Sequence, residues 1–148
     1  MKDYICAIIG AAGGALASAF GGFDAGLMTL LIFMAIDYVS GLIVAGVFHS
    51  STKTATGSLN SHVGWRGLCK KCMTLLYILI AQRLDLTLNT TFVRDMVTIA
   101  FITNELISIT ENAGLMGVPL PPVITRAIEL LTKKSEAAND NHTVHLDD

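Results

Sequence analysis

Long apolar stretches alternate with short polar segments along most of the chain. Residues 4–23 carry no charge, and residues 26–48 contain Asp37 as their only charged side chain. As a helix, the second stretch would be about 34 Å long, enough to cross a hydrocarbon core about 30 Å thick. Shorter apolar runs, flanked or interrupted by charges, predict two further spans near 68–88 and 92–112.

The pattern changes beyond residue 118, where the predicted membrane domain (1–118) ends. Three prolines between positions 119 and 122 break the fourth helix. Apolar residues then recur at helical spacing: Ile124, Ile128 and Leu131. Residues 119–134 are therefore predicted to form a short cytoplasmic, interfacial amphipathic helix. The polar segment 135–148 is predicted to be disordered.

Composition supports a membrane protein of the all-α class. The chain has 148 residues, of which 52% are hydrophobic and 15% are charged, against roughly 25% charged in an average soluble chain. The formal net charge of −2 gives no reason to expect nucleic acid as a partner. We therefore predict an integral membrane protein with about four transmembrane helices.

Basic residues indicate the orientation. The segment 49–71 contains four basic residues and no acidic one, and three more basic residues follow the last predicted span. Four spans place both groups, and both termini, on the cytoplasmic side. Three spans, with the termini on opposite faces, are the alternative. A cleaved signal peptide ending near Ala17-Ser18-Ala19 is a further alternative, disfavoured because Asp3 offsets its only lysine.

Asp37 is the first candidate functional residue. A carboxylate at the centre of a membrane helix costs roughly 2.5–3.5 kcal/mol on insertion scales, so it faces protein or water rather than lipid. Ser40 and Gly41 lie one turn away, which makes that side of the helix small and polar. Asp37 and Ser40 are predicted either to line a pore or to hold helices together by hydrogen bonds, and Gly41 is a candidate helix-packing residue.

The fourth predicted span carries a polar stripe. Its members are Thr98, Glu105, Ser108 and Asn112, with Asn104 and Glu111 flanking them. Such a stripe must be covered by protein or line an aqueous space. Two interpretations are open: several copies present the stripe to a central hole, or the stripe forms the polar core of one bundle.

Small residues and boundary charges complete the set of candidates. Gly10, Gly14 and Ser18 recur every four residues, a spacing that lets membrane helices approach closely. The predicted interfacial charges are Lys70, Lys71, Arg83 and Arg94. An ion pair of Arg83 with Asp95, or of Asp85 with Arg94, is expected to join the ends of the third and fourth spans.

The sequence contains no pattern that argues for an enzyme. The C-x-x-C at Cys69–Cys72 stands alone, and a zinc site would need two more ligands at suitable spacing. There is no Gly-rich phosphate loop, Ser/His/Asp set or H-E-x-x-H motif. No catalytic residue, metal or cofactor is predicted.

Three segments resemble the toxin secretion/phage lysis holin family. They are "IDYVSGLIVA" (36–45), "SHVGWRGLCKK" (61–71) and "NELISITENAGLMGVPLPPVITRAIELL" (104–131), in the family's order. The resemblance implies a phage-encoded protein of the bacterial cytoplasmic membrane that assembles with itself. It would permeabilise the membrane so that an endolysin reaches the cell wall or a toxin leaves. An antiholin-like regulator and a small channel subunit are the alternatives.

Overall fold

The computed structural model describes the backbone of residues 1–143 and the side chains of residues 1–137. Over these residues the chain forms helices and no strand, which confirms the predicted all-α class. The helices are α1 (Lys2–Ala19), α2 (Ala25–Gly46), α3 (Ser61–Leu88), α4 (Val93–Leu115) and α5 (Pro122–Thr143).

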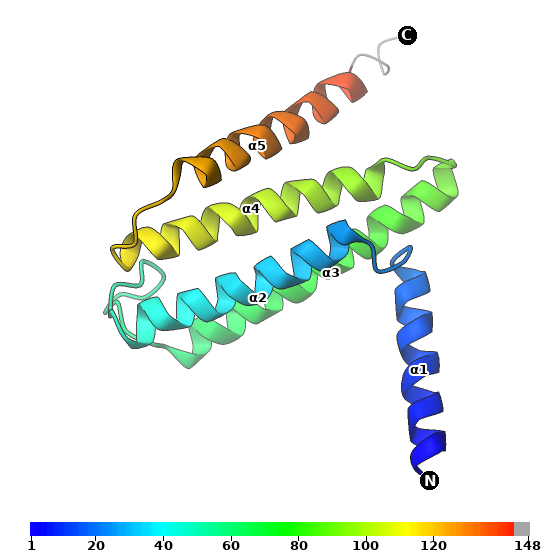
Figure 1. The fold of residues 1–148 in the computed structure, drawn as a ribbon, viewed down its shortest axis with the longest axis horizontal. Helices are drawn as coiled ribbons and strands as arrows, with labels where there is room; N and C mark the ends of the chain where they lie inside the picture. The colour runs from blue at the N-terminus through cyan, green and yellow to red at the C-terminus, as the bar shows by residue number, and fades with distance from the viewer. Residues whose placement is uncertain (144–148) are drawn as a thin grey trace.

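Helices α2, α3 and α4 lie side by side along their lengths, α5 runs beside α4, and α1 extends away from the others (Figure 1). The apolar core lies where the first three meet. It consists of Leu27, Leu30, Met34, Ile78 and Ile102. Helix α2 supplies three of these side chains, whereas α4 is the central helix, because α2, α3 and α5 all pack against it.

Among the described helices, α2 alone has both the length and the apolar composition expected of a membrane span. Helices α3 and α4 have 28 and 23 residues, so both are long enough to cross a bilayer. Both carry charged side chains along their lengths, however. The surroundings of those charges therefore decide whether α3 and α4 suit a membrane.

Helix α3 begins at Ser61, earlier than the start near residue 68 that hydropathy predicts. The Asn60 side chain accepts a hydrogen bond from the backbone N–H of His62 at 2.9 Å, which caps the helix. At the other end, Asn89 has a φ of 55°, a left-handed conformation that ends helices. Capping residues rather than apolarity set these boundaries.

A glycine elbow separates α1 from the bundle. Gly21 and Gly22 have φ values of 79° and 103°, which residues other than glycine rarely adopt. Asp24 then starts α2, because its carboxylate accepts a hydrogen bond from the Leu27 backbone N–H at 2.9 Å. Within the described part of the chain, no residue of α1 is buried.

Helix α5 packs lengthwise against α4, and its Leu131 contacts the apolar core (Figure 1). The helix continues to Thr143, beyond the predicted end at residue 134. Disorder was predicted from residue 135, which is wrong for 135–143, where the helix persists. The rest of that predicted tail, 144–148, lies outside the described residues.

Candidate functional site

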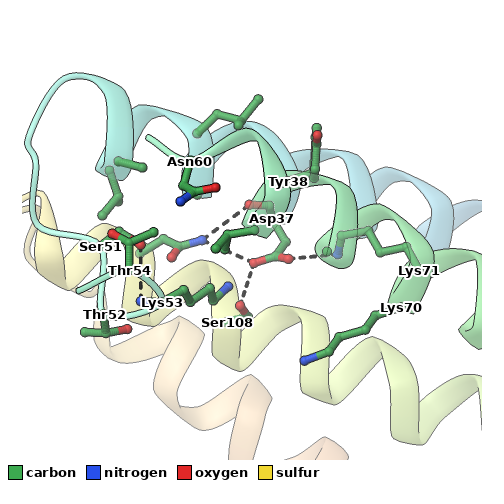
Figure 2. Close-up of a pocket in the computed structure, with 18 of the residues that line it drawn as sticks. Asp37, Tyr38, Ser51, Thr52, Lys53, Thr54, Asn60, Lys70, Lys71 and Ser108 are labelled. Atoms are coloured by element: carbon green, nitrogen blue, oxygen red, sulfur yellow. Dashed lines mark hydrogen bonds and ion pairs between the residues drawn. The ribbon is translucent and has the colours of Figure 1, made fainter. Parts of the chain in front are cut away.

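Asp37 lies on the face of α2 that meets α3 and α4. Its carboxylate is buried and contacts Lys71 of α3 (Figure 2), which also contacts Glu105 of α4. The Lys71 Nζ atom is 2.8 Å from Asp37 Oδ2 and 2.5 Å from Glu105 Oε2. The three side chains are only 13%, 11% and 8% exposed. One ammonium group thus joins carboxylates from two other helices.

Lys71, a predicted interfacial charge, makes its contacts inside the bundle. Lys71 points into the bundle, where two buried carboxylates need a counter-charge. Sequence reasoning missed this role, although a signal exists. Lys71, Ile78 and Asp85 recur every seven residues, which places them on one face of α3, and the last two are also buried.

The polar stripe of α4 completes the network around Asp37. The Ser108 hydroxyl donates to Asp37 Oδ1 at 2.5 Å. The Asn112 amide donates to the same oxygen at 3.1 Å and to Ser40 Oγ at 2.9 Å. Ser40 in turn donates to the Asp37 carbonyl oxygen at 3.0 Å. We call this group the Asp37 cluster: Asp37, Ser40, Lys71, Glu105, Ser108 and Asn112.

Two residues predicted with this group lie outside it. Thr98 is buried, but its hydroxyl donates to the Arg94 carbonyl oxygen at 2.7 Å, one turn back along α4. Asn104 is exposed and lines the mouth of a neighbouring cavity. The stripe therefore divides into a part that contacts Asp37 and a part that serves the start of α4.

A half-open cavity of about 250 Å³ lies beside the Asp37 cluster. It sits where the end of α2, the start of α3 and the loop between them meet. Lys53 and Asn60 from this loop region line it, together with Lys70 on α3 (Figure 2). Lys70 is exposed, in contrast to Lys71 next to it.

A second charged group lies at the opposite end of the bundle. Arg94 is buried, and its guanidinium donates a hydrogen bond to the Asp24 carboxylate and another to the Gly22 carbonyl oxygen at 3.2 Å. It also lies 3.5 Å from the exposed Asp95. Because the Arg94 guanidinium favours the ionised carboxylate, it holds the pKa of Asp24 below its usual value.

Asp85 of α3 joins this second group through the backbone of α4. Its carboxylate accepts from the Val93 and Arg94 backbone N–H groups at 3.0 and 2.9 Å, and from the Thr90 hydroxyl at 2.6 Å. Asp85 therefore caps the start of α4. We call this group the Arg94 cluster: Gly22, Asp24, Asp85 and Arg94.

These contacts revise the expected boundary ion pairs. Asp85 and Arg94 do meet, but through backbone N–H groups rather than through the guanidinium, which turns to Asp24. Arg94 itself is buried, although the Asp24 and Asp95 carboxylates beside it are partly exposed. Arg83 is exposed, and no ion pair with Asp95 is formed within the described residues.

The predicted packing residues differ in their surroundings. A Cβ atom at Gly41 would lie 3.7 Å from the Asn112 amide nitrogen, so Gly41 lies at the contact of α2 with α4. Apart from the adjoining residues and backbone of α1 itself, no atom of the described chain lies within 4 Å of such an atom at Gly10 or Gly14, and Ser18 is exposed. The small face of α1 is thus open in a single copy.

Metal chemistry receives no support from the described side chains. Within residues 1–137, no three His, Cys, Asp or Glu side chains gather as a metal site would require. The cysteines Cys6, Cys69 and Cys72 are free and exposed.

Comparison with known proteins gives relatives over most of the chain. The bacteriophage holin family matches residues 14–133. A Listeria monocytogenes protein named only as uncharacterized is 35% identical over 129 residues, 86% of each chain. A 14.9 kDa protein from the nagH 3′ region of Clostridium perfringens is 36% identical over 117 residues, 78% of this chain and 83% of its own. A probable holin of Bacillus phage phi105 is 31% identical over 115 residues, 77% and 76% of the two chains. No solved structure matches.

Proposed function

This chain belongs to the bacteriophage holin family, and we propose that it acts as a holin in the bacterial cytoplasmic membrane. Copies accumulate there, associate with one another, and form large non-selective lesions. The lesions release an endolysin for host cell lysis, or a toxin for export. The protein acts by permeabilising the membrane and carries out no chemical reaction of its own.

The Asp37 cluster is the observation that carries this mechanism. Charges lie inside the bundle, whereas large apolar side chains are exposed on α2 and α3: Ile32, Ile36, Val39, Ile43, Leu76, Ile80 and Leu84. This distribution suits lipid outside and polar contacts within. Helices α3 and α4 are acceptable as spans because their inward charges, Lys71 and Glu105, pair with each other rather than face acyl chains.

We infer four spans, formed by α1 to α4, with both termini and the loop before α3 in the cytoplasm. That loop and the start of α3 carry Lys53, Arg66 and Lys70 and no acidic residue. The Asp37 cluster then lies at bilayer depth near the cytoplasmic side. The Arg94 cluster lies near the outer surface.

Opening is proposed to separate α2 from α4 as copies assemble. In one closed copy, the polar groups of the Asp37 cluster bind each other. In a lesion these groups face water, which removes the desolvation free energy of keeping them buried. The open small face of α1, with Gly10 and Gly14, supplies contacts between copies. Membrane potential favours the closed form at about 2.3 kcal/mol per elementary charge moved through 100 mV.

The test is inducible expression in bacteria without other phage proteins, while membrane potential and leakage of a cytoplasmic marker protein are followed. The cluster holds two carboxylates against one ammonium group. Neutralising either acid leaves a balanced ion pair and strengthens the closed copy. Asp37→Asn and Glu105→Gln are therefore expected to delay the collapse of the potential.

Glu111→Gln is the matched control, because Glu111 is an exposed acid on the same helix. It is expected to leave the lysis time unchanged. Unchanged times for both cluster variants would refute the opening mechanism. A wild-type protein that leaves the potential intact would instead indicate an antiholin-like regulator, and selective ion flux without marker release would indicate a channel subunit.

A further inference from the structure

The cavity beside the Asp37 cluster has a charge balance of its own. Its charged lining residues are Asp37, Glu105, Lys53, Lys70 and Lys71. Lys71 is occupied by the two carboxylates. Lys53 acts on Asp37 through space without forming an ion pair, and Lys70 forms no ion pair in the part of the chain that the structure describes. Three ammonium groups against two carboxylates leave one excess positive charge around an open hollow.

The two unpaired lysines come from separate elements and meet at this hollow. Lys53 extends from the loop toward Asp37 and Ser108, and Lys70 extends from α3 toward α4 (Figure 2). Asn60 adds an amide group to the lining. A singly charged phosphate group placed between them would receive charge-assisted hydrogen bonds and neutralise the excess charge.

Apolar residues also line the cavity. They are Leu42, Val44, Ala45, Leu59, Val63 and Leu115. A cavity lined by both cations and aliphatic groups suits an amphiphile, with an anionic head and a hydrocarbon chain. The cavity lies at the helix ends, where the proposed topology puts the cytoplasmic headgroup layer of the bilayer.

We propose that this cavity binds the phosphodiester headgroup of one anionic phospholipid through Lys53 and Lys70. The inference rests on the proposed membrane location, and it adds a ligand to the loop before α3. A bound headgroup connects that loop to α3 beside the contact that joins α2 to α4. Anionic lipid would thereby stabilise the closed copy.

Lipid retention by the purified full chain tests this directly and does not depend on lysis. The protein is equilibrated in nanodiscs of phosphatidylcholine with or without phosphatidylglycerol, and retained lipid is counted by native mass spectrometry. The wild type should retain one phosphatidylglycerol with roughly tenfold preference over phosphatidylcholine. Lys53→Gln/Lys70→Gln should lose this preference, and Lys53→Arg/Lys70→Arg should keep it.

Lys133→Gln/Lys134→Gln is the matched control, since it removes two exposed lysines of α5 away from the cavity. Circular dichroism confirms that each variant is folded. Competition by inorganic phosphate alone at equal concentration would support the phosphate site but assign it to a free anion. Equal retention by wild type and Lys53→Gln/Lys70→Gln would overturn the proposal. A holin that lyses normally yet shows no such preference would disprove this inference while leaving the proposed function in place.

Discussion

The Asp37 cluster and the Arg94 cluster hold the same three-helix bundle at two positions, but they bind different parts of it. The Asp37 cluster joins α2, α3 and α4 mainly through side chains, with Lys71 between two acids. The Arg94 cluster binds the ends of the helices. Asp24 and Asp85 cap α2 and α4, and Arg94 connects one cap to the elbow at Gly22.

This difference indicates which end of the bundle can open. Separating the side chains of the Asp37 cluster leaves each helix intact, because helical backbone bonds do not pass through it. Separating the Arg94 cluster removes caps, which frays the first turns of α2 and α4. We therefore expect the bundle to open around Asp37 while the elbow end stays closed and acts as a hinge.

Of the variants that distinguish the two clusters, Lys71→Met is expected to change stability most. It leaves Asp37 and Glu105 buried side by side without a counter-charge, and breaking a buried ion pair costs about 3–5 kcal/mol. We expect the free energy of unfolding in detergent to fall by that amount, measured by denaturant titration. In cells, the potential should collapse earlier than with wild type. Lys134→Met, at an exposed lysine, should stay within about 0.5 kcal/mol; an equal loss there would contradict the role of the buried contact.

Asp85→Ala tests the opposite end. It removes the acceptor for two backbone N–H groups of α4, and losing a cap of this type costs about 1–2 kcal/mol. Amide hydrogen exchange at Val93 and Arg94 should accelerate, whereas Lys71→Met should leave those amides protected. Asp95→Ala is the control, since its side chain is 66% exposed and its pair with Arg94 is weak. Slow exchange in Asp85→Ala would argue against the hinge.

Gly21→Ala tests the geometry of the elbow, with an expected cost of about 1 kcal/mol. The added Cβ would lie 2.3 Å from the Gln82 side-chain oxygen, and φ is 79°. Gly22→Ala has a φ of 103° but meets no atom within 4 Å in the described chain, so it isolates the backbone strain. Adding Gln82→Ala to Gly21→Ala should restore stability to the Gly22→Ala level; no recovery would mean that the contact with Gln82 is not limiting.

The pH dependence of Asp24 gives the smallest expected effect. Arg94 lowers the folded pKa of Asp24 below its unfolded value. The carboxylate therefore stabilises the fold above the unfolded pKa of about 3.9, and this contribution disappears as pH falls through the folded pKa. Asp24→Asn keeps a capping oxygen but loses the charge. It should be slightly less stable than wild type at pH 7 and equally stable below the folded pKa, by acid titration. If the difference in stability between wild type and Asp24→Asn did not change with pH, Asp24 would be excluded as the titrating group.

Helical spacing predicts part of the site from the sequence. Glu105, Ser108 and Asn112 share a face because they are three and four residues apart, and the structure turns that face toward α2. Asp37 lies in an apolar stretch, so its carboxylate is expected to contact polar groups rather than lipid. Periodicity within one helix predicts these groupings without any knowledge of the other helices.

The partners across helices could not be predicted in the same way. Lys71 is 34 residues from both Asp37 and Glu105, and Arg94 is 70 residues from Asp24. Which lysine turns inward depends on the rotation of α3, and hydropathy places Lys70 and Lys71 equally at its boundary. Tertiary packing decides between them. The early start of α3 likewise depends on Asn60, a local cap that hydropathy ignores.

The position of α5 along α4 has a geometric consequence for insertion. If α4 crosses the bilayer as proposed, an α5 that stays beside it would carry Arg126, Glu129 and Lys133 into the acyl region. Each charge there costs roughly 2.5–3.5 kcal/mol at mid-depth. In a bilayer, α5 would therefore separate from α4 and bind to the lipid surface through its apolar face. Insertion would thus change the place of α5, while the contacts among α2, α3 and α4 stay as they are in the closed copy.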